Sequence, residues 1–448
     1  MAAIQQSTRW FQHALVACLA ALLTACGGGG GDAGSSCTAD ERKTFLQGYF
    51  DDWYFWTRQA PKPQPASAAT ADAYFNALLY AGTDPAFPAD RWSGYESTES
   101  FNRFFGDGQS LGYGIFVTGV EAKADPQRGL QVRYTEPLSP AALAGVVRGD
   151  DIVSINGVAA ATLIASEDYA VLSPTAAGTQ LNLVLRNGGV QRSVVLSAAT
   201  YGLTPVVGAK TLPTPAGRKV GYVLVKDLIS QTSGGLAAAF AGFGAHGVQD
   251  LVLDLRYNGG GLVSVGANLA SYVVGSRADA QVYANLVYNH QHAASNSASR
   301  FSAPANALAM SRVYVLTGPR TCSASEQLIN GLRPFANVVL VGDATCGKPV
   351  GFNPRSDNCG TTYSVVTFES TNSRGEGRYF DGLQPACAVT DDVSQALGAA
   401  NENLLATALR HADTGSCGVA GGLEMPQQRA PAARAWREPG ERQGMIAR

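Results

Sequence analysis

The chain has 448 residues, of which 46% are hydrophobic and 15% are charged. Its formal net charge of −2 argues against a nucleic-acid-binding protein, and its apolar fraction excludes disorder of the whole chain. The length predicts two to four domains. The sequence has no run of 18 apolar residues, so a polytopic membrane protein is excluded.

The first residues have the pattern of an export signal. Residues 14–23 form an apolar run that is too short to span a bilayer and is typical of a signal-peptide core. Residues 23–26 (Leu-Thr-Ala-Cys) resemble the lipobox of bacterial lipoproteins, in which Cys26 is lipidated; the alternative is ordinary signal cleavage beside an incidental cysteine. The resemblance implies a signal peptide over 1–25 and a Gly-rich tether over 26–37. Because Gly27 rather than Asp follows the cysteine, it also implies an outer-membrane lipoprotein that faces the periplasm of a Gram-negative bacterium.

Six cysteines remain once Cys18 and Cys26 are set aside. They are Cys37, Cys322, Cys346, Cys359, Cys387 and Cys417. An even number in an exported chain predicts disulfides, with 15 possible connectivities. No Cys or His spacing supports a metal site, so we expect none.

The pattern of apolar residues divides the rest of the chain into regions. Residues 38–105 are predicted to form an aromatic-rich helical domain, broken near Pro61, with a second helix near 70–80. Residues 201–417 alternate strands with helices and predict an α/β layer. The expected strands are 220–225, 248–255, 313–316 and 338–341, and the expected helices are 233–245, 263–273 and 324–332. Residues 418–448 are rich in Pro, Ala and Arg and are predicted to be a disordered tail.

Residues 106–200 read as short strands and turns. The segment 139–158 (SPAALAGVVRGDDIVSINGV) combines a short capped helix with an Asn-Gly hairpin, and it resembles a PDZ domain. PDZ domains add a peptide strand to a sheet edge and bind its terminal carboxylate on loop amides. The resemblance places that peptide-binding loop at Leu111, Gly112, Tyr113 and Gly114.

Two motifs in the α/β region can carry chemistry. Residues 321–326 (TCSASE) follow a strand and a turn and open a helix. Ser323 and Glu326 match a capping box, which is the purely structural interpretation. The functional interpretation is a nucleophile at a helix N-terminus, where free amides stabilise negative charge. Residues 254–261 (DLRYNGGG) end an apolar strand, and they indicate either a Gly-rich turn or an oxyanion hole.

Two further motifs are lookalikes. Residues 342–348 match GxxxxGK, but Pro349 stands where a hydroxyl should hold magnesium, which disfavours nucleotide binding. Residues 108–112 match GxSxG, but a strand rather than a helix follows them.

Four features follow one another along the chain: a PDZ-like segment, DLRxNxGG, SASE, and a GK pair whose lysine comes 25 residues after the serine. In this order they resemble the C-terminal processing peptidases, or tail-specific proteases, over roughly residues 38–415. The resemblance implies a tricorn-core-like α/β protease domain and a serine endopeptidase, with Ser323 as nucleophile and Lys348 as general base. It implies oxyanion donors at Ala324 and at Gly260 or Gly261. It implies no cofactor, and a protein substrate with an apolar C-terminus as partner; it leaves the oligomeric state open. Residues 381–385 resemble a later segment of the family.

A serine hydroxyl needs an adjacent base, and a lysine with a pKa of ~10.4 is mostly protonated at pH 7. Burial, and the lack of an acidic residue over 345–352, would lower the pKa of such a lysine. The alternative base is histidine, but none of His246, His290, His292 and His411 lies in a motif. Many relatives place a Gln four residues after the lysine; here Phe352 stands there, so Asn353 is the candidate third member.

If Ser323 and Lys348 meet, Cys322 and Cys346 come close enough to bond, and we predict that pair. Cys359–Cys387 is the second predicted pair, which leaves Cys37–Cys417. The alternatives to a protease are an inactive, PDZ-type peptide-binding lipoprotein and a Ser/Lys hydrolase that acts on a cell-wall ester or amide.

Overall fold

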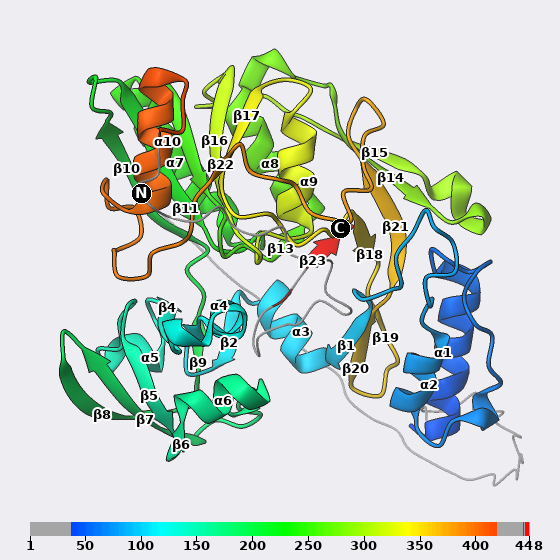
Figure 1. Ribbon diagram of the computed structural model, residues 1–448. Helices are drawn as coiled ribbons and strands as arrows, with labels where there is room; N and C mark the ends of the chain where they lie inside the picture. The colour runs from blue at the N-terminus through cyan, green and yellow to red at the C-terminus, as the bar shows by residue number, and fades with distance from the viewer. Residues whose placement is uncertain (1–36, 419–441, 443, 448) are drawn as a thin grey trace, which may run out of the picture. The chain divides into compact units, whose positions relative to one another are not determined.

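The computed structural model describes residues 37–418, 442 and 444–447, and these residues contain two six-stranded sheets (Figure 1). The predicted signal peptide, Cys26 and most of the tether lie outside the described residues, as do residues 419–441. None of the helices in the described ranges is long and apolar enough to cross a membrane.

The first six-stranded sheet has the order β10-β11-β12-β16-β17-β22, in which β10 and β11 are antiparallel and the other neighbours are parallel. Its strands are β10 (Val206–Pro213), β11 (Lys219–Val225), β12 (Asp250–Asp254), β16 (Arg312–Thr317), β17 (Asn337–Gly342) and β22 (Cys387–Ala388). The helices between and after them are α7 (Thr232–His246), α8 (Val263–Val274), α9 (Ala324–Leu332) and α10 (Asn403–Thr414). The predicted alternation of strands and helices is therefore confirmed.

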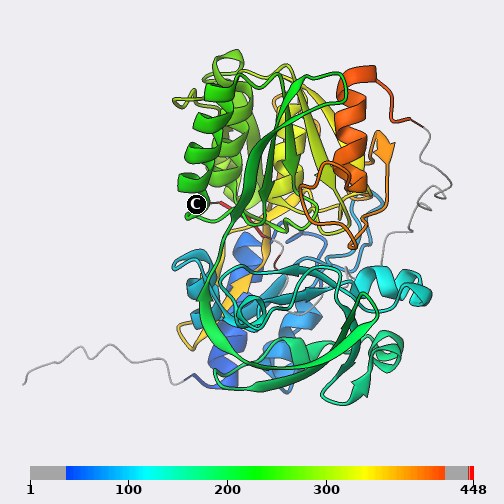
Figure 2. The ribbon, with the colours of Figure 1, turned by 90° about the vertical axis from the view of Figure 1, so that its left-hand side faces the viewer.

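Both faces of this sheet are covered by helices. Val223 and Leu253 point into a core shared with α7, α8 and α9, whereas Leu224 and Val252 point into a core shared with α10. Figure 2 shows α10 and α7 on opposite sides of the sheet. Strands buried on both faces read as continuous apolar runs, which is why they could be recognised in the sequence.

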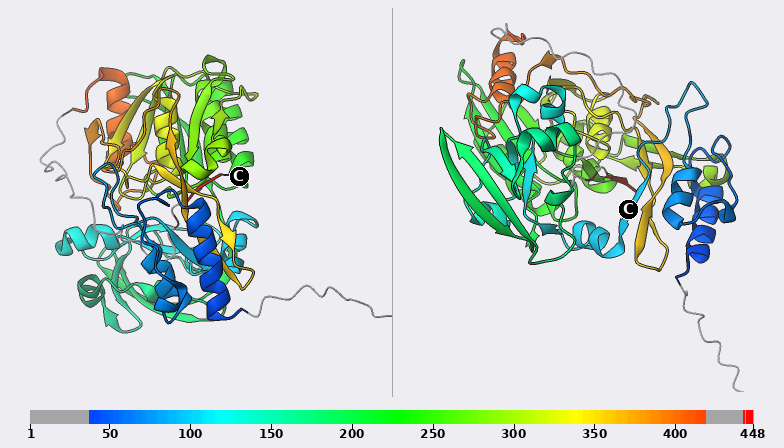
Figure 3. Two further views of the ribbon diagram at one scale, coloured as in Figure 1. Left: turned by 90° about the vertical axis from the view of Figure 1, so that its right-hand side faces the viewer. Right: turned by 60° about the horizontal axis from the view of Figure 1, so that its bottom comes forward.

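A second six-stranded sheet has the order β13-β23-β18-β21-β14-β15. Its strands are β13 (Gly260–Leu262), β14 (Val282–Tyr288), β15 (Ser297–Arg300), β18 (Val350–Phe352), β21 (Val366–Thr371) and β23 (Gly444–Ile446). Strand β23, red in Figure 3, pairs in parallel with both β13 and β18. The prediction of a disordered tail over 418–448 is thus wrong for residues 444–446, which obtain their order from backbone pairing with distant strands.

Residues 106–200 form a β-rich domain with its own hydrophobic core. Its strands are β2 (Gln109–Gly112), β3 (Ile115–Val117), β4 (Val132–Thr135), β5 (Asp151–Ile155), β6 (Val158–Ala159), β7 (Gln180–Asn187) and β8 (Val190–Ser197), and its helices are α4 (Gly119–Ala124), α5 (Pro140–Leu143) and α6 (Ala160–Ser166). The side chain of Ser139 caps α5, and the β5–β6 turn has positive φ at both Asn156 and Gly157, as the sequence indicates. Strand β9 (Ala199–Gly202) pairs with β2, so the expected boundary at residue 200 falls inside a strand.

The N-terminal region contains α1 (Ala39–Trp53), α2 (Ala71–Leu78) and α3 (Thr98–Phe105), together with β1 (Gly94–Ser97), which was not expected in a helical domain. Strand β1 pairs with β20 (Thr361–Ser364), which also pairs with β19 (Arg355–Ser356). Short 3-10 helices complete the described elements: η1 (Pro65–Ser67), η2 (Pro126–Arg128), η3 (Ala170–Leu172), η4 (Gly275–Arg277) and η5 (His290–Ser295).

Three disulfides lie in the described residues. Cys322–Cys346 is present as predicted. The other two predicted pairs are wrong, because the structure has Cys37–Cys359 and Cys387–Cys417. The reason is the fold: Cys359 lies in the β19–β20 hairpin near the start of α1, whereas Cys387 in β22 lies next to α10 and the segment that follows it.

Candidate active site

Three loops meet where β12, β16 and β17 end. Parallel neighbouring strands have their carboxyl ends at one edge of the sheet, where α/β proteins commonly bind ligands. The hydroxyl of Thr321 donates to the carbonyl of Leu255 at 2.8 Å, and the N–H of Cys346 donates to the carbonyl of Thr321 at 3.0 Å. Hydrogen bonds therefore connect the Gly-rich loop (residues 255–261), the serine loop (residues 318–323) and the lysine loop (residues 343–349).

Ser323 precedes α9 and has a left-handed backbone, with φ at +63°. This region is unfavourable for a residue with a side chain, so the surrounding contacts must hold it there, as they often do at functional sites. Ser323 is 0% exposed, and its Oγ has no hydrogen-bond partner among the described residues. Ser323 and Glu326 occupy the positions of the predicted capping box, and the N–H of Ser323 donates to Glu326, while the serine hydroxyl makes no hydrogen bond to the described residues.

The candidate oxyanion donors border one small space. Ala324 is the first residue of α9, so its N–H lies in the turn whose amides have no partner within the helix. A Cβ atom on Gly260 would lie 2.8 Å from the Ala324 nitrogen, so only glycine allows this close approach. The N–H of Gly260 itself donates to Asn258 Oδ1 at 2.8 Å.

Lys348 is 0% exposed, and its Nζ lies 3.8 Å from the ring centroid of Phe352. An aromatic face attracts an ammonium group, so Phe352 helps to position the lysine side chain. The amide of Asn353, the candidate third member, donates to the hydroxyl of Tyr288 at 3.2 Å.

The carboxylate of Glu326 connects the serine loop with the lysine loop. Its Oε2 accepts the N–H of Ser323 and of Lys348, each at 2.8 Å. Its Oε1 accepts the N–H of Gly347 at 2.8 Å and the hydroxyl of Thr345 at 2.5 Å. Burial raises the pKa of Glu326, and these four donors oppose that rise.

Two more features brace the lysine loop. The Cys322–Cys346 disulfide joins it to the residue before Ser323. The segment 381–385 also lies against it, because the N–H of Leu383 donates to Thr345 Oγ1 at 2.7 Å. This segment was expected from the resemblance alone, and the structure gives it a place beside the site.

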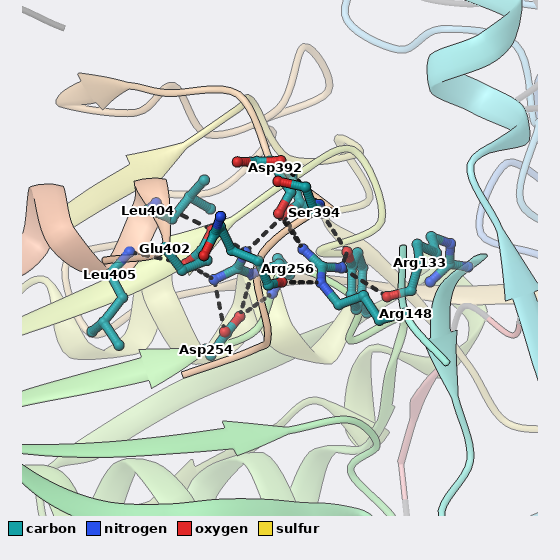
Figure 4. A network of polar contacts seen from close by, with 12 residues as sticks. Arg133, Arg148, Asp254, Arg256, Asp392, Ser394, Glu402, Leu404 and Leu405 are labelled. Atoms are coloured by element: carbon teal, nitrogen blue, oxygen red, sulfur yellow. Dashed lines mark hydrogen bonds and ion pairs between the residues drawn. The ribbon is translucent and has the colours of Figure 1, made fainter. Parts of the chain in front are cut away.

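A buried ionic network surrounds Arg256, which lies in the Gly-rich loop just after β12. The guanidinium of Arg256 bonds to both carboxylate oxygens of Glu402 and to Asp254, at 2.8–2.9 Å (Figure 4). Its further partner Asp391 also bonds to Arg148 of the β-rich domain at 2.7 Å. Although burial acts in the opposite direction, the two guanidinium groups hold the pKa of Asp391 below its usual range.

The histidine alternative receives no support from the described contacts. His292 bonds to Asp52 at 2.8 Å, His411 bonds to Tyr314, and His246 bonds to a carbonyl of its own helix. His290 is exposed.

The predicted peptide-binding loop lines a groove of about 790 Å³. The groove extends from residues 111–114 of the β-rich domain to Gly444 and Ile446 of β23. Gly114 has a φ of +74°, and a Cβ there would lie 2.0 Å from the Cβ of Ser139, so the loop is closed tightly over α5.

Comparison with known families agrees with this geometry. A model of peptidase family S41 matches residues 219–389, which contain all three loops, and a model of the S41 N-terminal domain matches residues 41–94. The chain belongs to peptidase family S41. This is a family of serine peptidases, and its two models cover α1, α2 and most of the α/β domain.

Relatives of this S41 chain include C-terminal processing peptidases. The chain is 29% identical over 272 residues to the chloroplastic C-terminal processing peptidase of Tetradesmus obliquus, covering 57% of this chain and 56% of that one. It is 29% identical to the carboxyl-terminal-processing peptidase 3 of Arabidopsis thaliana, covering 68% and 59%. The matches thus span a little over half the length of these curated relatives. A putative S41 protease from Bacteroides fragilis shares the fold, with a TM-score of 0.64, 24% identity, and 83% and 97% of the two chains covered.

Sequence reasoning recognised the serine and lysine loops but missed several supporting residues. Glu326 was seen as a capping residue, and nothing local indicates that it also reaches Lys348. Asn258 lies inside the recognised DLRYNGGG motif, and its side chain bonds to Ser325 and to the carbonyl of Val225. Two of the acidic partners of Arg256, Asp391 and Glu402, lie 135 and 146 residues away, so only the fold reveals them.

Proposed function

We propose that this S41 chain is a serine endopeptidase that uses a Ser323/Lys348 dyad. The observation that carries the proposal is Glu326, whose carboxylate accepts the N–H groups of both residues and so fixes their loops side by side. Lys348 would take the proton of Ser323 Oγ as that oxygen attacks a peptide carbonyl. The N–H of Ala324, at the positive end of α9, would stabilise the oxyanion. The second donor would be the N–H of Gly261, or the N–H of Gly260 once it has left its hydrogen bond to Asn258.

The substrate in this proposal is an exported protein with an apolar C-terminus, which a PDZ-like β-rich domain captures. The groove supports the route, because it connects the loop 111–114 with the neighbourhood of β13 and β18. The names of the C-terminal processing relatives support the class of substrate.

Lipidation of Cys26 and an outer-membrane site facing the periplasm belong to the same proposal. Residues 23–26 support the anchor, and three disulfides suit an oxidising compartment. The test is membrane fractionation: Cys26→Ser should release the protein into the soluble fraction, and equal retention of both forms would contradict the anchor.

The activity is tested by cleavage of an unfolded protein with an apolar C-terminus. We expect Ser323→Ala and Lys348→Met to lower kcat at least about a thousandfold. The exposed residues Ser302 and Lys210 provide matched controls, since Ser302→Ala and Lys210→Met should leave cleavage unchanged. Binding of an apolar tail peptide without cleavage by any form would instead favour an inactive peptide-binding lipoprotein.

A further inference from the structure

Strand β23 lies between β13, which begins in the Gly-rich loop, and β18, which follows the lysine loop. The N–H of Gly444 donates to the carbonyl of Gly259 at 3.0 Å, and the N–H of Ala447 donates to the carbonyl of Phe352 at 3.2 Å. One neighbouring strand, β13, begins within the Gly-rich loop, and the other, β18, begins two residues after Lys348. Residues 444–447 therefore have the Gly-rich loop on one side and the lysine loop on the other.

The carbonyl of Gly444 occupies the space beside the candidate oxyanion donors. The Cβ position of Gly260 is 2.2 Å from the Gly444 oxygen and 2.8 Å from the Ala324 nitrogen, so both atoms border the same point. A substrate carbonyl that receives hydrogen bonds from these amides would have to lie there.

We propose that residues 444–447 are an intramolecular ligand of the peptide-binding cleft, and that they lie where an extended substrate lies and compete with it. The proposal rests on the proposed function, because it takes the cleft beside Ser323 as the substrate site. With β23 in place, Ser323 and Lys348 are both 0% exposed, as expected if the strand fills the substrate's place. Strand addition is a common mode of peptide recognition, and it relies mainly on backbone hydrogen bonds.

The side chains of the segment indicate which peptides the cleft accepts. A Cβ atom on Gly444 would lie 3.2 Å from the Cα of Gly261, so this position takes a small residue. Met445 is fully buried, and its sulfur lies 3.6 Å from Nε2 of Gln327, one turn into α9. The cleft thus fits an extended peptide in which a small residue precedes an apolar one.

The segment is anchored at its upstream end in the groove. Arg442 forms an ion pair with Glu96 at 2.8 Å and donates to the hydroxyl of Ser100 at 2.6 Å. Arg442, Gly444 and Ile446 all line the groove that extends to the loop 111–114. A tail captured by the β-rich domain would approach β13 along the same groove and meet this segment.

The test uses chains that carry Ser323→Ala, so that no result depends on hydrolysis. A fluorescent peptide with the sequence of residues 442–447 is titrated into the full chain and into a chain that ends at Gly440. A tethered strand has an effective concentration on the order of 1 mM, which weakens a competing peptide of ~0.1 mM affinity about tenfold. We therefore expect the shortened chain to bind at least tenfold more tightly. Equal affinities, or no binding to the shortened chain, would overturn the proposal.

A second comparison keeps every residue of the chain. Met445→Glu places a charge in the buried site and should expel the strand, so that this variant binds like the shortened chain. Met445→Leu keeps the apolar volume and should bind like the parent. Equal binding by the two variants would count against the proposal, and urea unfolding of each checks that it is folded.

If the chain that ends at Gly440 and the Met445→Glu variant both fail to fold, hydrogen exchange in the full chain tests the proposal. Saturating peptide should accelerate exchange at the amides of residues 444–447, and unchanged exchange would overturn the proposal. The proposed function can fail separately: a chain that cleaves no protein but shows the tenfold difference in binding would refute the activity and leave the intramolecular ligand standing.

Discussion

Glu326 Oε2 accepts a hydrogen bond from the backbone N–H of Lys348 at 2.8 Å, although the two residues are 22 positions apart. The same oxygen accepts the N–H of Ser323. One buried carboxylate therefore fixes the spacing of two loops whose side chains are proposed to exchange a proton, and a change of the carboxylate should affect both stability and turnover.

We predict that Glu326→Gln destabilises the protein and lowers kcat more than it changes KM. The glutamine has the same size, but its NH₂ group cannot accept the N–H groups that one carboxylate oxygen accepts. A buried donor left without an acceptor costs about 1–3 kcal/mol. Urea unfolding and steady-state kinetics measure the two effects. Glu99→Gln, on the exposed side of α3, is the control and should stay within about 0.5 kcal/mol of wild type. A variant with unchanged stability would show that Glu326 does not hold the loops.

Arg256→Met should lower the free energy of unfolding by about 3–5 kcal/mol. The change leaves Asp254 and Glu402 as buried carboxylates without their cationic partner. Arg186→Met is the matched control, because its ion pair with Asp151 lies at the surface and contributes at most about 1 kcal/mol. Chemical unfolding measures both variants. Equal losses in the free energy of unfolding would show that the buried network stabilises the fold no more than a surface ion pair does.

Glu136 should make the protein less stable as the pH rises. Burial, together with the nearby carboxylate of Asp227, raises the pKa of Glu136 to about 8 from 4.5. Between these values the native state binds more protons than the unfolded chain, so the stabilisation that this group provides at low pH is lost as the pH rises through that window. Glu136→Gln remains neutral and should remove this dependence. The urea midpoint of the variant, relative to that of wild type, should therefore be higher at pH 8.5 than at pH 5. A constant difference would contradict the raised pKa.

Loss of the Cys322–Cys346 bond should reduce activity more than loss of Cys387–Cys417. The two bonds close loops of similar length, 24 and 30 residues, so each should stabilise the fold by about 3.5 kcal/mol. Only the first lies beside Ser323. The paired serine variants Cys322→Ser/Cys346→Ser and Cys387→Ser/Cys417→Ser should thus unfold at similar urea concentrations but differ in kcat. Equal kcat values would show that the bond has no part in shaping the site.

The elements that were predicted well are those whose signals lie close together in the sequence. Helix α9 has its predicted bounds, because Ser323 follows a strand and turn and an apolar face follows the serine. The Asn-Gly turn between β5 and β6 and the cap at Ser139 depend in the same way on a few adjacent residues. For the same reason the serine loop and the lysine loop could be located from their motifs.

What could not be predicted depends on contacts between distant residues. Strand β23 is only three residues long, and it is ordered by pairing with strands about 180 and 90 residues upstream. Cys37 and Cys359 are separated by 322 residues, and no local pattern distinguishes this pair from the other connectivities. The amide of Asn353 is directed to Tyr288, and only the packing of β18 against its neighbours determines that direction.

The Cys37–Cys359 disulfide has a practical consequence for any study of self-digestion. It closes a ring that contains the β-rich domain, α7, α8, the serine loop and the lysine loop. A single break in the backbone anywhere inside that ring releases no fragment while the bond is intact, so a nicked chain keeps its full mass on a non-reducing gel. Purity judged without a reductant would hide internal cleavage, and the nicked and intact forms separate only after the bond is reduced.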